Sequence, residues 1–113
     1  MTENTEILLE RLKENKVQFS EVISTIESLY NHTPTAFKNS EAYNEASQNQ
    51  GSAKVFSFAK LHKLSKEDTL LLFAEHYQSV LNTPEATDHQ NIRQFIKNGW
   101  EGIQFEGEAL TVK

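Results

Sequence analysis

Residues 65–81 read SKEDTLLLFAEHYQSVL, and this stretch carries the strongest structural signal in the sequence. Ser65 can accept a hydrogen bond from the amide three residues later, while Asp68 can return the interaction and favour the positive end of a helix. Apolar residues then recur on one helical face, namely Leu70, Phe73, Tyr77, Val80 and Leu81. The stretch therefore predicts one helix that begins at Ser65 and runs to about residue 81, before Pro84 interrupts it.

Weaker helical patterns flank this stretch on both sides. The further predicted helices span about residues 5–14, residues 20–33, residues 53–62 and about residues 89–98. Ser20, and either Thr87 or Asp88, suit the N-cap position of a helix, and Gly99 suits the left-handed conformation that often follows one. The run Val55-Phe56-Ser57-Phe58 also fits a short strand, although we prefer a buried helix there.

Two segments lack a helical period. Residues 33–49 predict a long ordered loop with at most one short helix, in which Phe37 and Tyr43 are the anchors to the core. Near the end, Ile103 and Phe105 alternate with polar residues, which predicts an extended segment laid against the helices rather than a sheet. The sequence thus predicts a mainly α, compact single domain over residues 1–113, with four to five helices, this loop and the short extended C-terminal segment.

Composition limits the possible partners and chemistries. The chain of 113 residues has 37% hydrophobic residues and seven Phe, enough for one core, and it has no cysteine, which excludes disulfides and thiolate chemistry. Its formal charge of −5 disfavours nucleic acid and anionic membranes as partners. No apolar run has the roughly 20 residues that a membrane-spanning helix needs. The acidic, polar start of the chain does not resemble a general secretory signal peptide.

The densest polar cluster is Asp88-His89-Gln90-Asn91-Ile92-Arg93. On a helix, His89 and Arg93 share a face near Asp88, so they could orient an anionic ligand, or Asp88 could tune His89 as a general base. A structural interpretation is preferred: Asp88 caps the helix, Asn91 binds the loop of residues 33–49, and Arg93 pairs with an acid.

Asparagine amides form a second candidate group. Asn39, Asn44 and Asn49 could bind a small polar ligand, but they equally suit left-handed turns that stabilise an irregular loop, which is the preferred interpretation. Gly51-Ser52-Ala53-Lys54 has the free amides and the cation of a phosphate site, yet it lacks the full Walker spacing.

Three further patterns favour structural roles. Ser57 and Lys60 match the Ser-x-x-Lys spacing without the accompanying motifs of acyl-transfer enzymes. Trp100, between two glycines, fits a core plug better than an exposed hot spot. The four histidines are scattered without metal-ligand spacing, so no metal and no cofactor is predicted. They are His32, His62, His76 and His89.

The order of several blocks resembles the HopJ type III effector family over about residues 19–110. These blocks are Thr33-Pro34-Thr35-Ala36-Phe37, Asn49-Gln50-Gly51-Ser52, Thr87-Asp88-His89-Gln90-Asn91-Ile92-Arg93 and Gly99-Trp100 with Gly102-Ile103. The resemblance implies a bacterial protein, but it brings no known activity or catalytic residue. Ala53 stands where the family often has cysteine, which argues against a thiol-dependent role.

The functional hypotheses fall into two classes. We prefer a non-enzymatic interaction domain, effector-like, with a protein partner that contacts the surface around residues 33–49 and the Asp88 cluster. The alternative is a small-molecule-binding protein or an enzyme that uses Asp88, His89 and Arg93. The candidate ligand-binding residues are Asp88, His89, Asn91, Arg93, Asn39 and Asn49. The location is expected to be the cytoplasm or, as the resemblance implies, export by a type III system, and the sequence leaves the oligomeric state open.

Overall fold

A computed structural model describes residues 2–14, 17–40, 42–46 and 49–112, with the side chains of residues 2–5 excepted. In chain order, its elements are α1 (Thr2–Lys13), α2 (Phe19–Leu29), β1 (Tyr30–His32), β2 (Phe37–Asn39), β3 (Ala42–Asn44), α3 (Gln50–Leu61), α4 (Lys66–Leu71), α5 (Glu75–Asn82), α6 (Gln90–Asn98), a 3-10 turn η1 (Gly99–Gly102), β4 (Ile103–Phe105) and β5 (Leu110–Val112). The predicted mainly helical fold is confirmed, but the described chain has six α-helices and also has strands.

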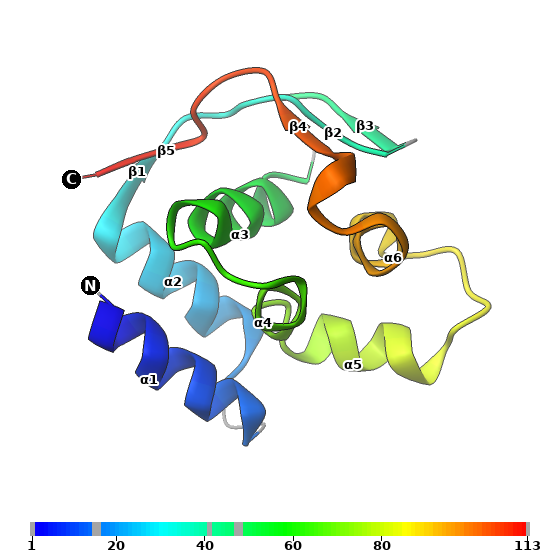
Figure 1. Cartoon of the computed structure of the whole chain (residues 1–113), viewed down its shortest axis with the longest axis horizontal. Coiled ribbons are helices and arrows are strands. Elements are labelled where there is room, and N and C mark those ends of the chain that lie inside the picture. Colours follow the sequence, from blue (N-terminus) through cyan, green and yellow to red (C-terminus); the bar gives the residue numbers. More distant parts are fainter. Residues whose placement is uncertain (1, 15–16, 41, 47–48, 113) are drawn as a thin grey trace.

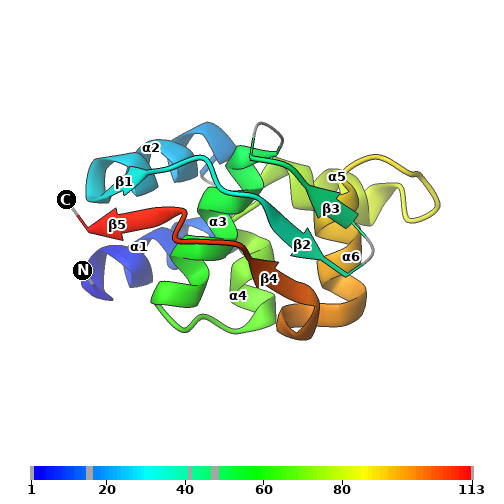
Figure 2. The ribbon, with the colours of Figure 1, turned by 90° about the horizontal axis from the view of Figure 1, so that it is seen from above.

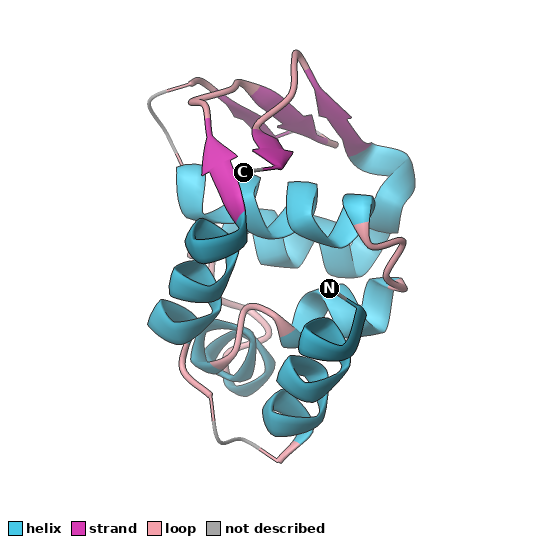
Figure 3. Ribbon diagram, turned by 90° about the vertical axis from the view of Figure 1, so that its left-hand side faces the viewer, coloured by secondary structure: helices cyan, strands magenta, loops and turns pink. Residues whose placement is uncertain are grey.

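Helix α3 lies between a layer of strands and a layer of helices. Figure 1 shows all the strands on one side of α3, with α1, α4 and α5 on its other side, and Figure 3 shows the same separation from a second direction. Because α3 is covered on both faces, Val55, Phe56, Phe58 and Ala59 are fully buried. The preferred helix over residues 53–62 is confirmed, since a segment buried on every side supports a helix rich in apolar residues.

Two distant segments form one antiparallel ribbon. Tyr30 is paired with Val112 in the β1–β5 register, and Asn39 is paired with Ile103 in the β2–β4 register. Between them the Thr33 amide donates to the Ala109 carbonyl at 2.9 Å. Residues 30–40 therefore run beside residues 102–112 in one constant register, as Figure 2 shows from above.

The ribbon corrects two predictions. The segment predicted as a loop contains β2 and β3, which pair with each other, and the C-terminal segment joins sheets through β4 and β5. Short three-residue strands give too little alternation for a pattern to be recognised. Their backbone groups nevertheless need partners when they lie over the core, and the distant segment supplies these partners.

The helix predicted over residues 65–81 is two helices. Its start is confirmed, because the Ser65 hydroxyl accepts a hydrogen bond from the Asp68 amide at 3.1 Å. α4 ends at Leu71, however, and Ala74 has φ 51° and ψ −123° before α5 begins. The prediction of one continuous helix is therefore wrong at Ala74.

Helix ends differ from those predicted, most at the end of α2, which stops at Leu29 because Tyr30–His32 form β1. α2 begins at Phe19 with Gln18 as N-cap, so Ser20 lies inside the helix. The N-cap of α6 is His89, with φ 51°, rather than Thr87 or Asp88. Gly99 ends α6 with a positive φ of 61°, so the predicted stop is confirmed, but its ψ of −151° differs from the predicted left-handed helical conformation. No helix of the described residues is long and apolar enough to cross a membrane.

Aromatic rings connect the layers. The fully buried Phe56 ring contacts the rings of Phe37 in the ribbon, Phe73 between α4 and α5, and Phe95 in α6, with centroids 5.0–6.0 Å apart. Trp100 is half-buried against this core and donates its indole N–H to the Leu64 carbonyl at 3.2 Å. The predicted core role of Trp100 is confirmed.

Candidate functional site

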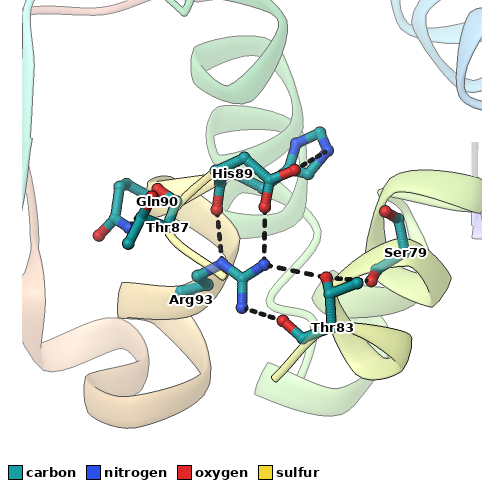
Figure 4. Close-up of polar contacts among 7 residues, drawn as sticks. Ser79, Thr83, Thr87, His89, Gln90 and Arg93 are labelled. Carbon is teal, nitrogen blue, oxygen red and sulfur yellow. Dashed lines mark hydrogen bonds and ion pairs between the residues drawn. The ribbon is translucent and has the colours of Figure 1, made fainter. Parts of the chain in front are cut away.

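The Asp88 cluster divides into two parts that face different ways. Arg93 points back along α6 and fixes the loop that precedes this helix (Figure 4). Its guanidinium donates to the Asp88 carboxylate at 2.7 Å, to the Asp88 carbonyl at 2.5 Å and to the Thr83 carbonyl at 2.8 Å. With 11% of its side chain exposed, Arg93 is occupied by its own loop.

Asp88 behaves as the acid partner of this arginine. The hydrogen bond from Arg93 holds the pKa of the Asp88 carboxyl below its ordinary value, and the nearby His89 acts in the same direction. The side chain of Asp88 is 61% exposed. The predicted pairing of Arg93 with an acid is thus confirmed, while the predicted cap by Asp88 is not formed.

Buried amides connect α6 to the ribbon. The Asn91 side chain exchanges hydrogen bonds with Asn44, at 3.0 and 3.1 Å, and accepts one from Asn39 at 3.1 Å. Asn49 donates to Asn44 at 2.6 Å. The prediction that Asn91 binds the segment of residues 33–49 is confirmed, and the three predicted loop asparagines belong to the same network.

His89 lies on the other side of this network, in a pocket of about 330 Å³ that we call the histidine pocket. Residues from the starts of four helices, α2, α3, α5 and α6, meet there. The lining consists of Phe19, Asn44, Asn49, Gly51, Ser52, Phe73, His76, His89, Gln90, Asn91 and Ile92. Of the six residues predicted to bind a ligand, His89, Asn91 and Asn49 line this pocket, whereas Asp88, Arg93 and Asn39 do not.

Two imidazoles distinguish the histidine pocket. The rings of His76 and His89 have centroids 5.1 Å apart and are tilted by 37°. The Phe19 ring meets the His76 ring edge-on at 4.8 Å and stacks with Phe73 at 6.0 Å, which gives the pair an aromatic support. Among the described residues, the His76 imidazole has no hydrogen-bond partner, so its ring nitrogens are available to a ligand.

Sequence reasoning missed the role of His76. The two histidines belong to different helices, and no motif spacing relates them. They meet because α5 begins after the turn at Ala74, which places His76 in the first turn of α5 opposite the N-cap of α6. The predicted single helix over residues 65–81 gave no reason to expect that His76 lies beside His89.

The helix starts at the pocket are open. Asn49 and His89 are the N-cap residues of α3 and α6, both with positive φ, and neither caps its helix with a side-chain hydrogen bond. First-turn amides have no partner within an α-helix, so they favour acceptors and negative charge. Gly51 and Ser52, in the first turn of α3, line the pocket.

The remaining candidate motifs stay apart from this pocket. Lys54 pairs with Glu27 at 2.9 Å, so it does not complete a phosphate cradle with Gly51. Ser57 is buried, while Lys60 is exposed. His32 and His62 bond to Gln50 and Tyr30, and burial lowers the pKa of both histidines. No group of three potential metal ligands occurs within the described part of the chain.

These features define a small domain of helices and an antiparallel ribbon, with a polar pocket where helix starts meet. The model of the HopJ type III effector protein family matches residues 5–110, and the chain belongs to this family.

A solved structure has the same fold. It is titled "Crystal structure of unknown function protein VPA0580" and is 46% identical, with a TM-score of 0.88 over 96% of this chain and 92% of that chain. No curated protein matches the chain significantly. The relative therefore supports the fold, and its description names no activity.

Proposed function

We propose that this protein binds a small anionic molecule in the histidine pocket. The observation that carries the proposal is the pairing of His76 and His89, from two helices, in one pocket with unbonded ring nitrogens on His76. Converging polar groups in a concave site on an aromatic support are what a small-ligand site requires. The pocket of about 330 Å³ lies at the lower end of the range of small-molecule sites.

The charge of the ligand follows from the lining. No Lys, Arg, Asp or Glu lines the pocket, so positive potential there comes from the imidazoles and from the helix amides at Gly51 and Ser52. A bound anion would accept hydrogen bonds from the ring N–H groups of these imidazoles and from the free helix amides.

A thermal-shift titration with inorganic phosphate and with acetate tests this proposal. We expect both anions to raise the midpoint of unfolding for the wild type, increasingly with anion concentration, as binding linkage requires. His76→Ala and His89→Ala should remove most of the shift. His32→Ala is the matched control, because that histidine lies outside the pocket and should leave the shift intact. Equal shifts in all four proteins would refute the site.

A second candidate is the effector-like interaction domain favoured by the sequence. It is supported by the description of the family as type III effector proteins and by Tyr43, which is 55% exposed on the edge strand β3 within the segment of residues 33–49. A translocation reporter fused after the chain tests export. A partner captured from host extract by the wild type, and lost with Tyr43→Ala but not with Leu81→Ala, would place the contact on β3.

A further inference from the structure

A second hollow lies at the other end of α3, and we call it the edge groove. It has a volume of about 590 Å³ and runs between the last turns of α3 and the segment from β4 to β5. Its lining consists of Ser57, Lys60, Leu61, Phe105, Gly107, Glu108, Ala109, Leu110, Thr111 and Val112. None of these residues lines the histidine pocket, so the two sites can be tested independently.

The backbone of β5 leaves one side of the groove unpaired. β5 pairs with β1 alone among the described strands. In an antiparallel ladder, successive residues direct their N–H and C=O groups to opposite sides. The Ala109 carbonyl accepts from Thr33 on the β1 side. By this alternation the backbone groups of Thr111 also face β1. The backbone groups of Leu110 and Val112 face the open edge.

The same edge carries exposed apolar side chains. Val112 is 69% exposed and Leu61 is 53% exposed, although both are large hydrophobic residues. Leu110, two residues before Val112 on the same face of the strand, is buried. An open strand edge with apolar residues beside it is the kind of surface that pairs with another chain.

Charge at the edge groove permits a copy of the same chain as the partner. The chain carries a formal charge of −5, which opposes association of two copies. The edge groove is an exception, since Lys60 and Glu108 are the only charged residues among the described ones that line it, and their charges cancel. When a two-fold axis brings two such grooves together, the side of each groove that carries Lys60 faces the neutral surface of the other groove, which includes the carboxylate of Glu108.

We infer that the protein forms a two-fold dimer in which β5 pairs antiparallel with β5 of a second copy. Antiparallel strand edges are self-complementary, because every outward donor of one copy meets an outward acceptor of the other. Leu110 pairs with Val112 of the partner subunit, and the reverse pair is identical. Thr111 lies on the axis, opposite its own counterpart. A four-stranded ribbon replaces two marginal two-stranded ones.

Sedimentation velocity of the full chain, from micromolar to near-millimolar concentration, measures the association. We expect a monomer–dimer equilibrium that Val112→Pro abolishes, because proline removes an outward N–H without touching the β1 ladder. Leu61→Lys should weaken the dimer by at least tenfold in Kd. Leu81→Lys, an exposed residue of α5 outside the groove, should leave it unchanged.

A cysteine placed on the axis tests the register. The chain contains no cysteine, so Thr111→Cys introduces a single thiol whose counterpart should lie opposite it at disulfide-forming distance. We expect rapid formation of a covalent dimer under mild oxidation. Gln104→Cys, exposed on β4, should remain monomeric. A wild type that stays monomeric at all concentrations, or equal oxidation rates for the two cysteine variants, would overturn the inference.

Discussion

Three asparagine side chains, Asn39, Asn44 and Asn91, lie almost entirely inside the protein and bond to one another rather than to water. Burying an amide is unfavourable unless its donors and acceptors are matched. In this fold the three side chains bond across different elements, with only the Asn39 Oδ1 lacking a partner among the described buried side-chain atoms, so the network fixes how α6 meets β2 and β3. The histidine pocket lies directly beside this network.

Removal of the central amide should therefore be costly. We expect Asn91→Leu to lower the free energy of unfolding by about 2–4 kcal/mol, because it removes the buried side-chain hydrogen bonds that Asn91 makes with Asn39 and Asn44. Asn98→Leu, exposed on the same helix, should change it by no more than about 0.5 kcal/mol. Urea denaturation of the two variants gives the comparison. Equal destabilisation would show that the network contributes nothing specific.

His62 gives a pH dependence whose direction is set by burial. Its ring bonds to the Tyr30 hydroxyl at 2.9 Å, and burial lowers the pKa of His62. The unfolded chain therefore takes up a proton at a higher pH than the folded one, so stability is complete above the unfolded pKa of about 6.5 and falls as the pH drops below it.

His62→Gln should flatten this acid-side loss of stability. Glutamine can keep a bond to Tyr30 but does not titrate, so the free energy of unfolding should differ less between about pH 7 and about pH 5 than in the wild type. Some dependence should remain, because burial also lowers the pKa of His32. Denaturant midpoints at the two pH values provide the measurement. An unchanged difference would exclude His62 as a source.

At the scale of elements, the break between α4 and α5 has a tertiary cause. The Glu75 carboxylate accepts a hydrogen bond from the Phe19 amide at 2.6 Å, at the start of α2. Phe73 packs between Phe19 and Phe56. These contacts turn the chain at Ala74, whose positive φ is unfavourable for any residue with a Cβ. The helical period on either side of Ala74 gives no sign of this turn.

Glycine at this turn should relieve the backbone. We expect Ala74→Gly to raise the free energy of unfolding by about 0.5–1 kcal/mol, because glycine tolerates positive φ better than alanine does. Ala86→Gly, in an exposed loop without positive φ, should lower it slightly by adding freedom to the unfolded chain. Thermal melts of the two variants, compared with the wild type, give opposite signs if the turn is strained. A loss of stability in Ala74→Gly would argue against strain.

At the scale of the whole molecule, the ribbon joins the C-terminal end of the described chain to residues 30–40. Residues 102–112 pair with residues 30–40, and both lie over α3. The termini of the ribbon therefore belong to the same cooperative unit as the Phe56 core.

A substitution near the end of the ribbon should therefore destabilise the whole domain. We expect Leu110→Ala to lower the free energy of unfolding by about 2–4 kcal/mol, as for other buried leucines. Trp100 fluorescence and far-ultraviolet circular dichroism should follow one transition. Thr111→Ala, exposed on the neighbouring position, should be close to neutral, measured at a concentration below that of any association. Two separate transitions would show that the ribbon unfolds independently.

The sequence determined the features that depend on neighbours along the chain. The cap at Ser65, the amphipathic stripes and the stop at Gly99 rest on local hydrogen bonds and on the helical period, so patterns reveal them. The same local chemistry predicted that Asn91 would bind the segment of residues 33–49 and that Arg93 would pair with an acid.

Only the tertiary structure decided the ribbon, the turn at Ala74 and the meeting of His76 with His89. Each depends on which distant segments come together: three-residue strands show no clear alternation by themselves, and two histidines on separate helices share no spacing. Burial then makes these distant contacts obligatory, because backbone and side-chain polar groups over the core must find partners wherever the chain provides them. The candidate site results from these contacts between distant segments, and a local sequence pattern does not reveal them.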